Sequence, residues 1–508
     1  MSEKVETTAP GSRSDRHGSS QPVESAAERS DKRAPSAVFI IVGVVIIGVA
    51  VAMVFGGLSK LIVGVLAIVL LLLLMAIGMP IGVAMILASV AGLIGVVPMR
   101  AVLGSLQSTT FSAVASWSLS ALPLFILMGT AMWRGGIASK AYTAANQWLG
   151  RVPGGLAVAT NVAGASLAAS TGSSMGVTFT MGRMALPEMF RLGYSTRLST
   201  GSVAMAGTLG QVFPPNITLI IYAGVAGTAV GPQLLAAFVP AGVLTVAFAL
   251  TAIVWALVSP KEAPRANKTD VTWGSRFRAL VGLIPIVVIL LVVLGGMFGG
   301  IFTATEAAAF GAAAAIVISI VTAGKGNRGL RPTIAYLRKT LVSTVASVAG
   351  IFVILIGAML LTRMMALSGL AQAFSRWLVG LQMGAVELLL VLIVFYIILG
   401  MFLETLPMVL LTVPLLSAPL QAAGVDMIWF GVFLVILCEI GMVFPPIGLL
   451  TFLVHRIAQD PEVNRGRPVP LSAVFGGTMP FVAVVVLILV LLIFVPDIAL
   501  WLPESARR

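Results

Sequence analysis

The sequence predicts an all-α polytopic membrane protein that contains inverted repeats, two re-entrant hairpins and broken helices. Of the 508 residues, 59% are hydrophobic and only 10% are charged. In a soluble domain about a quarter of the residues are charged. Residues 38–58 and 61–99 carry no charge, and about 20 apolar residues suffice to cross a bilayer as a helix. These runs also lack the alternation of apolar and polar residues that marks the strands of a membrane barrel.

Two proline pairs inside apolar segments predict the broken helices. Pro214 and Pro215 lie in GTLGQVFPPN, and Pro445 and Pro446 lie in EIGMVFPPIG. Proline removes a backbone donor and clashes with the preceding turn, so each pair should interrupt its helix. A carbonyl freed in this way is tolerated only where it is buried in protein or lines a polar cavity. Two such breaks in corresponding positions indicate a transporter binding site. The alternative is a pair of simple kinks.

Composition also divides the chain into segments. The first 36 residues hold six Lys or Arg and six Asp or Glu among few apolar residues, so they are expected to form a disordered cytoplasmic tail. The run at 37–57 predicts an extra N-terminal transmembrane helix. The rest is expected to form a first inverted repeat at 61–258 with a hairpin at 155–190, a cytoplasmic loop at 259–278, and a second inverted repeat at 279–500 with a hairpin at 385–420.

The distribution of positive charge predicts the orientation. With the tail in the cytoplasm and both hairpins non-crossing, most of the 31 Lys and Arg fall in cytoplasmic segments, including 134–151 and 325–339. This bias explains the net charge of +13 without nucleic-acid binding. Crossing helices are expected at about 37–57, 61–78, 80–96, 121–134, 198–228, 234–258, 279–297, 305–323, 341–361, 430–454 and 478–500.

An internal repeat supports the same architecture. Segment 126–150 resembles segment 354–380, and Pro214 corresponds to Pro445 at a nearly constant offset along the chain. Five expected crossings separate the two copies, and an odd number inverts the second copy. Folds of this kind place substrate and ions near the midplane of the membrane, between the repeats.

The first predicted hairpin turns at a run of small polar residues. Four hydroxyl groups and one glycine favour non-helical backbone there and could supply oxygens to a hard cation or donors to a carboxylate. The run should face the GTLG segment of the first broken helix, and the alternative is close helix packing by small residues. The residues of the run are Ser170, Thr171, Gly172, Ser173 and Ser174, and those of the facing segment include Gly207, Thr208 and Gly210.

Three glutamates stand in or beside apolar segments. Glu404, followed by Thr405, lies at the turn of the second hairpin, where a carboxylate is costly and usually functional. The alternative for Glu404 is a position at the outer mouth, in contact with water. Glu439 precedes the second proline pair and could bridge to a backbone donor, bind a cation or serve the structure. Glu306 follows Thr303 at the spacing of a helix start, which favours a structural role.

Signatures of an enzyme or a cofactor site are absent from the sequence. The histidines are His17 in the tail and His455 at a predicted cytoplasmic end, and Cys438 stands alone in an apolar helix. No zinc motif or phosphate loop occurs. We therefore expect no catalytic residues and no cofactor. The segment 134–151 is interpreted as an amphipathic helix at the membrane interface.

Several strings resemble the large membrane subunit of tripartite ATP-independent periplasmic (TRAP) transporters, the DctM-like permeases of the ion transporter superfamily. They are STGSSMGVTFTMGRMALPEMFRLGYSTRLSTGSVAMAGTLGQVFPPNITLIIYAG (170–224), LGMFLETLPMVLLTVP (399–414) and IWFGVFLVILCEIGMVFPPIG (428–448). The similarity runs over about 61–500 in the same order and spacing. The chain departs from it at Phe444 and Leu450, where the family often has Thr and Asn.

The resemblance implies sodium-coupled uptake of an organic acid, such as a C4-dicarboxylate, across a bacterial inner membrane. It implies that a transport domain carrying the hairpins moves like an elevator against a scaffold. It also implies two partners: a small four-helix membrane subunit (DctQ-like) and a periplasmic substrate-binding protein (DctP-like). The main alternative is a stand-alone sodium/dicarboxylate symporter of the same superfamily. Less favoured alternatives are an intramembrane enzyme and a scaffold without transport.

The resemblance further implies two sodium sites, with sodium acting as the coupling ion. Many of their ligands should be backbone oxygens, while the side chains of Ser173, Thr208 and Thr405 could contribute hydroxyl oxygens. The first site would fall at Ser170, Gly172, Ser173, Gly207, Thr208 and Gly210. The second would fall at Glu404, Thr405, Gly441 and the carbonyls before Pro445, with Pro214 in the corresponding break of the first repeat.

Overall fold

A computed structural model describes residues 34–116, 119–264, 272–322 and 329–506, and within these ranges every regular element is a helix. Most of the predicted cytoplasmic tail lies outside the described residues. The helices of the first half are α1 (Ala34–Phe55), α2 (Lys60–Ala76), α3 (Ile81–Val96), α4 (Met99–Val114), α5 (Ala121–Arg134), α6 (Ile137–Leu149), α7 (Gly155–Thr171), α8 (Ser174–Arg191), α9 (Thr196–Val212), α10 (Ile217–Ala226) and α11 (Val230–Val258).

The second half of the chain is also formed by helices. A π-helical turn at Leu291–Gly295 joins α13 to α14. The helices are α12 (Trp273–Val281), α13 (Ile284–Leu290), α14 (Gly296–Phe298), α15 (Ala304–Val321), α16 (Leu330–Ser368), α17 (Leu370–Gly380), α18 (Ala385–Gly400), α19 (Thr405–Ala422), α20 (Met427–Gly441), α21 (Leu449–Ala458), α22 (Pro461–Asn464), α23 (Leu471–Phe494) and α24 (Asp497–Ser505).

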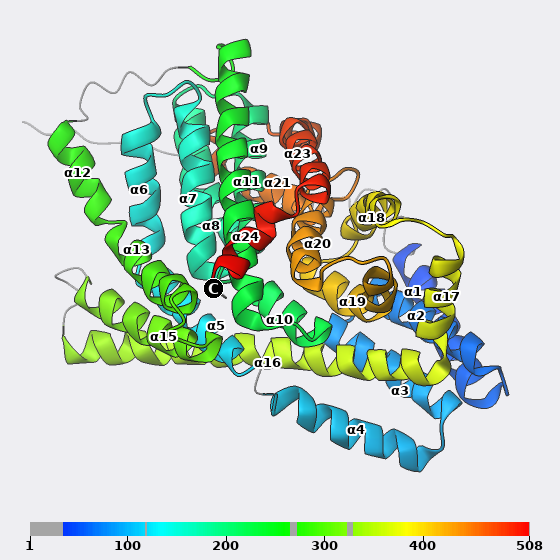
Figure 1. The fold of residues 1–508 in the computed structure, drawn as a ribbon. Coiled ribbons are helices and arrows are strands. Elements are labelled where there is room, and N and C mark those ends of the chain that lie inside the picture. The colour runs from blue at the N-terminus through cyan, green and yellow to red at the C-terminus, as the bar shows by residue number, and fades with distance from the viewer. Residues whose placement is uncertain (1–33, 117–118, 265–271, 323–328, 507–508) are drawn as a thin grey trace, which may run out of the picture.

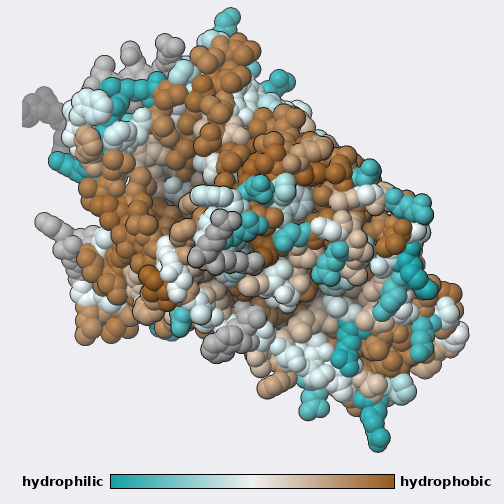
Figure 2. All heavy atoms as spheres, viewed as in Figure 1, coloured by the Kyte–Doolittle hydropathy of each residue, from teal (hydrophilic) through white to brown (hydrophobic). Residues whose placement is uncertain are grey.

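Six described helices are long and apolar enough to cross a membrane, and α9 with α10 forms a seventh candidate bent by 43°. The side chains of Val246, Leu250 and Val254, which recur at helical spacing along α11, are all more than half exposed. Figure 2 shows hydrophobic side chains over much of the surface around α11, α12 and α13. Apolar surface on this scale suits contact with lipid, so the prediction of an all-helical, multi-pass membrane protein is confirmed.

One long helix, α16, packs along several helices of the first half. α16 has 39 residues and runs across the lower part of Figure 1, where it contacts α3, α4 and α5. Its backbone approaches α3 closely, because a Cβ added at Gly357 would lie 2.8 Å from the Gly82 carbonyl oxygen. A residue larger than glycine would push the two helices apart at this crossing.

Helices from both halves of the chain surround the buried helix α9. α9 contacts α7 and α8 of its own repeat and also α20, α21 and α23 of the other. A Cβ at Gly201 in α9 would overlap the carbonyl of Gly477 in α23, so these two backbones touch. Corresponding pairs cross between the halves, since α8 packs on α21 while α19 packs on α10. The two halves thus use matching helices to enclose a common interior.

Several helices were not expected from the sequence, among them α4 and α24, and α16 is longer than expected. α4 was not expected because its residues are not uniformly apolar: Arg100 and several hydroxyl residues interrupt it, and only one face, which includes Val102 and Ser105, is buried. α24 was also not expected. α16 begins at Leu330 instead of about 341, because its first turns are basic and polar and lack the hydropathy used to find crossing helices.

Candidate substrate and ion site

The first proline pair interrupts the chain between α9 and α10. α9 ends at Val212 and α10 begins at Ile217. The side chain of Asn216 caps α10 by accepting a hydrogen bond from the Leu219 N–H at 2.8 Å. Across the break, the Thr218 hydroxyl donates to the side-chain oxygen of Gln211. Side chains therefore satisfy backbone and polar groups that the prolines leave without helical partners.

The turn between α7 and α8 lies against this break. Gly172 ends α7 with φ of +56°, a conformation that favours glycine. Ser173 caps α8 by accepting a hydrogen bond from the Gly176 N–H at 3.2 Å. A Cβ added at Gly172 would lie 3.5 Å from the backbone nitrogen of Ile217. The tip of the helix pair thus reaches the first residue of α10.

Two glycines let the beginning of α8 approach α9. A Cβ at Gly207 would overlap the hydroxyl of Thr178. A Cβ at Gly210 would lie 2.7 Å from the Ser173 carbonyl oxygen, which is closer than real side chains come. The structure therefore brings the serine-rich run and the GTLG segment together. This contact also satisfies the alternative prediction of close helix packing, because both interpretations require small residues here.

Hydroxyl groups in this region differ in their surroundings. The buried Thr208 hydroxyl donates to the Met205 carbonyl at 2.7 Å within its own helix. The Thr178 hydroxyl is buried without a hydrogen-bond partner among the described residues. The side chains of Ser170 and Thr171 lie outside the described part of the chain, although both residues end α7.

The second proline pair separates α20 from α21. α20 ends at Gly441 and α21 begins at Leu449. The N–H of Leu450 donates to the Met442 carbonyl at 2.9 Å, and the Thr451 hydroxyl donates to the Val443 carbonyl at 3.0 Å. Both carbonyls precede the prolines, so the start of α21 stabilises the interrupted end of α20. The predicted break is therefore present, and Leu450 and Thr451 hold it.

The turn between α18 and α19 lies against α20 in the same way. A Cβ at Gly441 would lie 2.6 Å from the Cα of Gly400, and a Cβ at Gly400 would lie 2.7 Å from the Cα of Gly441. The two backbones therefore touch where α18 ends and α20 ends. In both halves, a glycine near the end of the interrupted helix, Gly210 or Gly441, therefore allows the neighbouring helix pair to approach closely.

Glu439 joins the two hairpin tips. Its side chain is buried, with 1% of the residue exposed. One carboxylate oxygen accepts a hydrogen bond from the Ser174 hydroxyl at 2.7 Å, and the other accepts one from the Thr405 hydroxyl, also at 2.7 Å. Ser174 begins α8 and Thr405 begins α19, so one carboxylate connects both halves of the protein. Within the described ranges, no Lys or Arg forms an ion pair with it.

The other two glutamates lie in different surroundings. Glu404 precedes α19, is exposed, and makes no side-chain capping hydrogen bond. Glu306 forms a capping box at the start of α15, where its carboxylate accepts from the Thr303 N–H at 2.8 Å. The structural role expected for Glu306 is confirmed, and this residue is not part of the site.

The predicted residues therefore fall into two clusters that meet at one carboxylate. Sequence reasoning listed Glu439 without deciding its role, and it missed Asn216, Gln211 and Thr451. The capping role of Asn216 could have been found, because Asn before an apolar run is a helix-start signal. The first cluster holds Gly172, Ser173, Ser174, Gly207, Thr208 and Gly210 beside Pro214; the second holds Thr405, Glu439 and Gly441 beside Pro445.

A comparison with known protein families shows which family the chain belongs to. The family model described as "Tripartite ATP-independent periplasmic transporter, DctM component" matches residues 68–498, most of the chain. The chain belongs to this family. The resemblance expected from the sequence is confirmed, and the permease forms one component of a tripartite system.

Relatives of this permease are named for different transported solutes. The C4-dicarboxylate TRAP transporter large permease protein DctM of Vibrio cholerae serotype O1 is 30% identical over 455 residues, covering 84% of this chain and 95% of that protein. The ectoine TRAP transporter large permease protein TeaC of Halomonas elongata is 27% identical over 428 residues, covering 84% and 96%. The isethionate TRAP transporter permease protein DctMQ of Oleidesulfovibrio alaskensis is 26% identical over 437 residues, covering 84% and 64%. These relatives are transporter permeases, and this permease is likewise a transporter subunit and not an enzyme.

A solved structure shares the fold. The YdaH transporter of Alcanivorax borkumensis superposes on the permease with a TM-score of 0.54 at 15% identity, covering 78% of this chain and 89% of that chain. At this identity the likeness concerns the arrangement of helices and says nothing about the cargo.

Proposed function

We propose that this TRAP permease takes up an organic acid together with sodium ions across a bacterial inner membrane. The observation that supports the proposal best is the buried Glu439 carboxylate between two hydroxyl groups from opposite halves. A buried carboxylate without a cationic partner is costly and is usually functional in a membrane protein. Oxygen ligands from carboxylate, hydroxyl and interrupted backbone are those that a hard cation prefers.

The proposed sodium sites follow the two helix breaks. The first would use Ser173, Thr208 and backbone oxygens near Gly207 and Gly210. The second would use Thr405, backbone oxygens near Gly441, and Glu404 at its open side. Two sodium ions would offset the charge of a dicarboxylate, so the loaded site would cross the membrane without a net negative charge.

The two hairpin tips would then control access to the cargo. Separating either tip from the interior breaks a hydrogen bond to Glu439, since Ser174 and Thr405 each donate to it. In the proposed cycle, ions bind at the breaks and stabilise the closed tips, and the domain carrying both hairpins moves against the remaining helices. The long helix α16 and its neighbours α3 and α5 would belong to the static part.

Two partners complete the proposed system. The family description is tripartite, and one relative is named DctMQ and is longer than the region it shares with this chain. We therefore expect a small four-helix membrane subunit and a periplasmic substrate-binding protein. The names of the relatives include C4-dicarboxylate, ectoine and isethionate, so the cargo here is an organic acid or a related small polar solute.

Reconstituted transport tests the proposal. The permease, its small subunit and its binding protein are placed in proteoliposomes, and a thermal-shift screen of the binding protein with organic acids first selects the cargo. Uptake should require an inward sodium gradient, and it should rise with an inside-negative potential when the sodium ions carry more charge than the cargo. Equal uptake in potassium without a sodium gradient would rule out sodium coupling. Uptake by the permease alone would instead favour the stand-alone symporter.

A further inference from the structure

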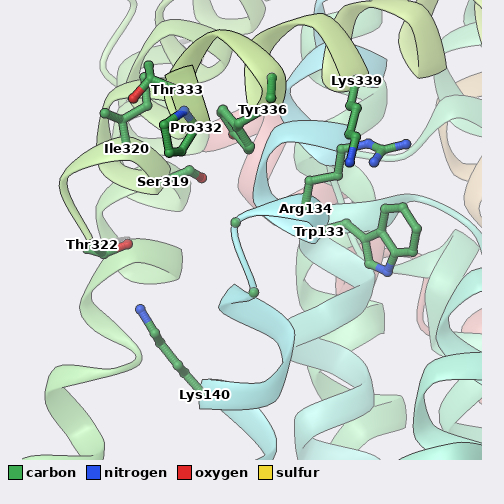
Figure 3. A pocket seen from close by; sticks show the side chains of 13 residues that line it. Trp133, Arg134, Lys140, Ser319, Ile320, Thr322, Pro332, Thr333, Tyr336 and Lys339 are labelled. Carbon is green, nitrogen blue, oxygen red and sulfur yellow. The ribbon is translucent and has the colours of Figure 1, made fainter. Parts of the chain in front are cut away.

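One pocket of the protein is lined by residues other than those around Glu439. It has a volume of about 640 Å³ and lies between the end of α5, the start of α6, the end of α15 and the first turns of α16. Figure 3 shows the Arg134 and Lys339 side chains extending into the same region from opposite walls, while Lys140 comes from α6. None of the residues discussed for transport lines this pocket.

The pocket collects positive charge that no carboxylate of its own walls neutralises, while the Arg134 guanidinium lies over the Trp133 ring, 5.5 Å from its centroid. Arg134, Lys140 and Lys339 belong to three different helices, and no Asp or Glu is among the lining residues. Among the described residues, Arg183 and Arg191 form ion pairs with Asp460 and Glu188, and neither pair lines this pocket. Three cations around one volume repel each other, so an anion bound between them would lower the electrostatic energy.

Hydrogen bonds fix the walls in place. The Ser319 hydroxyl of α15 and the Tyr336 hydroxyl of α16 both donate to the Ala131 carbonyl of α5, at 3.2 and 3.0 Å. A Cβ added at Gly135 would overlap the Ser319 hydroxyl, so α5 and α15 meet closely. The three basic side chains therefore project from a scaffold that is already assembled.

The surroundings suit the edge of a membrane. Val321, Leu330 and Ile334 are apolar residues beside the pocket, and each is more than half exposed. Charged side chains next to exposed apolar ones are typical of the level of lipid headgroups. The positive-inside bias assigned 134–151 and 325–339 to the cytoplasmic side independently, and the structure places residues of both segments around one pocket.

We propose that this pocket binds a phosphate group, supplied by the headgroup of an anionic phospholipid in the cytoplasmic leaflet. Basic pockets between membrane helices on this side of the bilayer suit such headgroups. Arg134 would bind the phosphate oxygens through its planar guanidinium, and Lys140 and Lys339 would add point charges. The exposed apolar residues would contact the acyl chains. The proposal is independent of sodium coupling and of the identity of the cargo.

Native mass spectrometry of the delipidated full-length permease tests it. The protein is titrated with phosphatidylglycerol, with phosphatidylcholine, and with inorganic phosphate as a competitor. The wild type should retain one phosphatidylglycerol molecule more tightly than phosphatidylcholine. The double variant Arg134→Gln/Lys339→Gln should bind it roughly tenfold or more weakly, because two of three cations are gone.

Arg338→Gln is the matched control, since Arg338 is the exposed neighbour of Lys339 on α16 and does not line the pocket. It should bind as the wild type does, and all variants should unfold at the same temperature. Displacement by millimolar inorganic phosphate, without preference between the lipids, would keep the phosphate site but assign it to the free ion. If the double variant binds phosphatidylglycerol and inorganic phosphate as tightly as the wild type does, the proposal is wrong.

Discussion

The Glu439 carboxylate accepts a hydrogen bond from the Thr405 hydroxyl at 2.7 Å, which fixes the beginning of α19 to the last turn of α20. The opposite oxygen of the same carboxylate holds Ser174 at the beginning of α8. A single side chain thus receives one donor from each hairpin. Any movement of one tip relative to the other changes the hydrogen bonding of this carboxylate.

Replacing Glu439 should separate its structural and ion-binding roles. Glu439→Ala leaves two buried hydroxyls without their acceptor and should destabilise the fold by about 1–3 kcal/mol. Glu439→Gln keeps the shape and one oxygen, so it should unfold closer to the wild type. If the carboxylate helps to hold sodium, the Gln variant should still need a several-fold higher sodium concentration for half-maximal uptake. Thermal unfolding and uptake against sodium concentration measure both effects.

Gly207 provides a test of the contact between α8 and α9. Gly207→Ala places a Cβ against the Thr178 hydroxyl and should cost about 1–3 kcal/mol through overpacking. The second substitution Thr178→Ala removes that hydroxyl and should restore part of the stability and uptake. Gly242→Ala is the control, because no atom lies within 4 Å of the added Cβ. Lack of rescue in the double variant would contradict the packing described here.

Thr451 should contribute to stability, because its hydroxyl bonds across the second helix break. Thr451→Val keeps the volume and removes the hydrogen bond to the Val443 carbonyl, so the buried carbonyl loses its donor. We expect a loss of about 1–3 kcal/mol in the free energy of unfolding and slower uptake. In Thr251→Val the lost bond runs within one regular helix, to the Ala247 carbonyl at 2.8 Å. Similar losses in both variants would show that the break has no special need for Thr451.

Glu306 should behave as a structural residue. Glu306→Ala removes half of the capping box at the start of α15 and should lower stability by about 0.5–2 kcal/mol. At temperatures where the variant is folded, the sodium dependence of its uptake should match that of the wild type. A changed sodium dependence would place this carboxylate in the ion pathway instead.

Local chemistry made much of this fold predictable. Proline cannot continue a helix, so the interruptions after Val212 and Gly441 follow from the sequence alone. The serine-rich turn also had a recognisable composition. This turn was also expected to face Gly207 and Gly210 of the first broken helix, as it does.

The central contact could not be predicted in the same way. Ser174 and Glu439 are 265 positions apart, and no periodic pattern links a hydroxyl in one repeat to a carboxylate in the other. Glu404 was favoured as a functional residue because it stands at the predicted turn, whereas the structure leaves Glu404 exposed and buries Glu439. Depth within a packed interior depends on the whole fold and not on the neighbouring residues.

The length of α16 has a mechanical consequence. At 1.5 Å per residue, its 39 residues extend about 58 Å, nearly twice the roughly 30 Å thickness of a hydrocarbon core. Such a rod must lie strongly inclined or project from the membrane, and it touches α5 toward one end and α3 toward the other. Because α16 is one continuous helix, it holds the contact of Tyr336 with α5 and the contact of Arg363 with Ser105 at a fixed separation. The proposed static part would therefore behave as one rigid body while the domain carrying the hairpins moves.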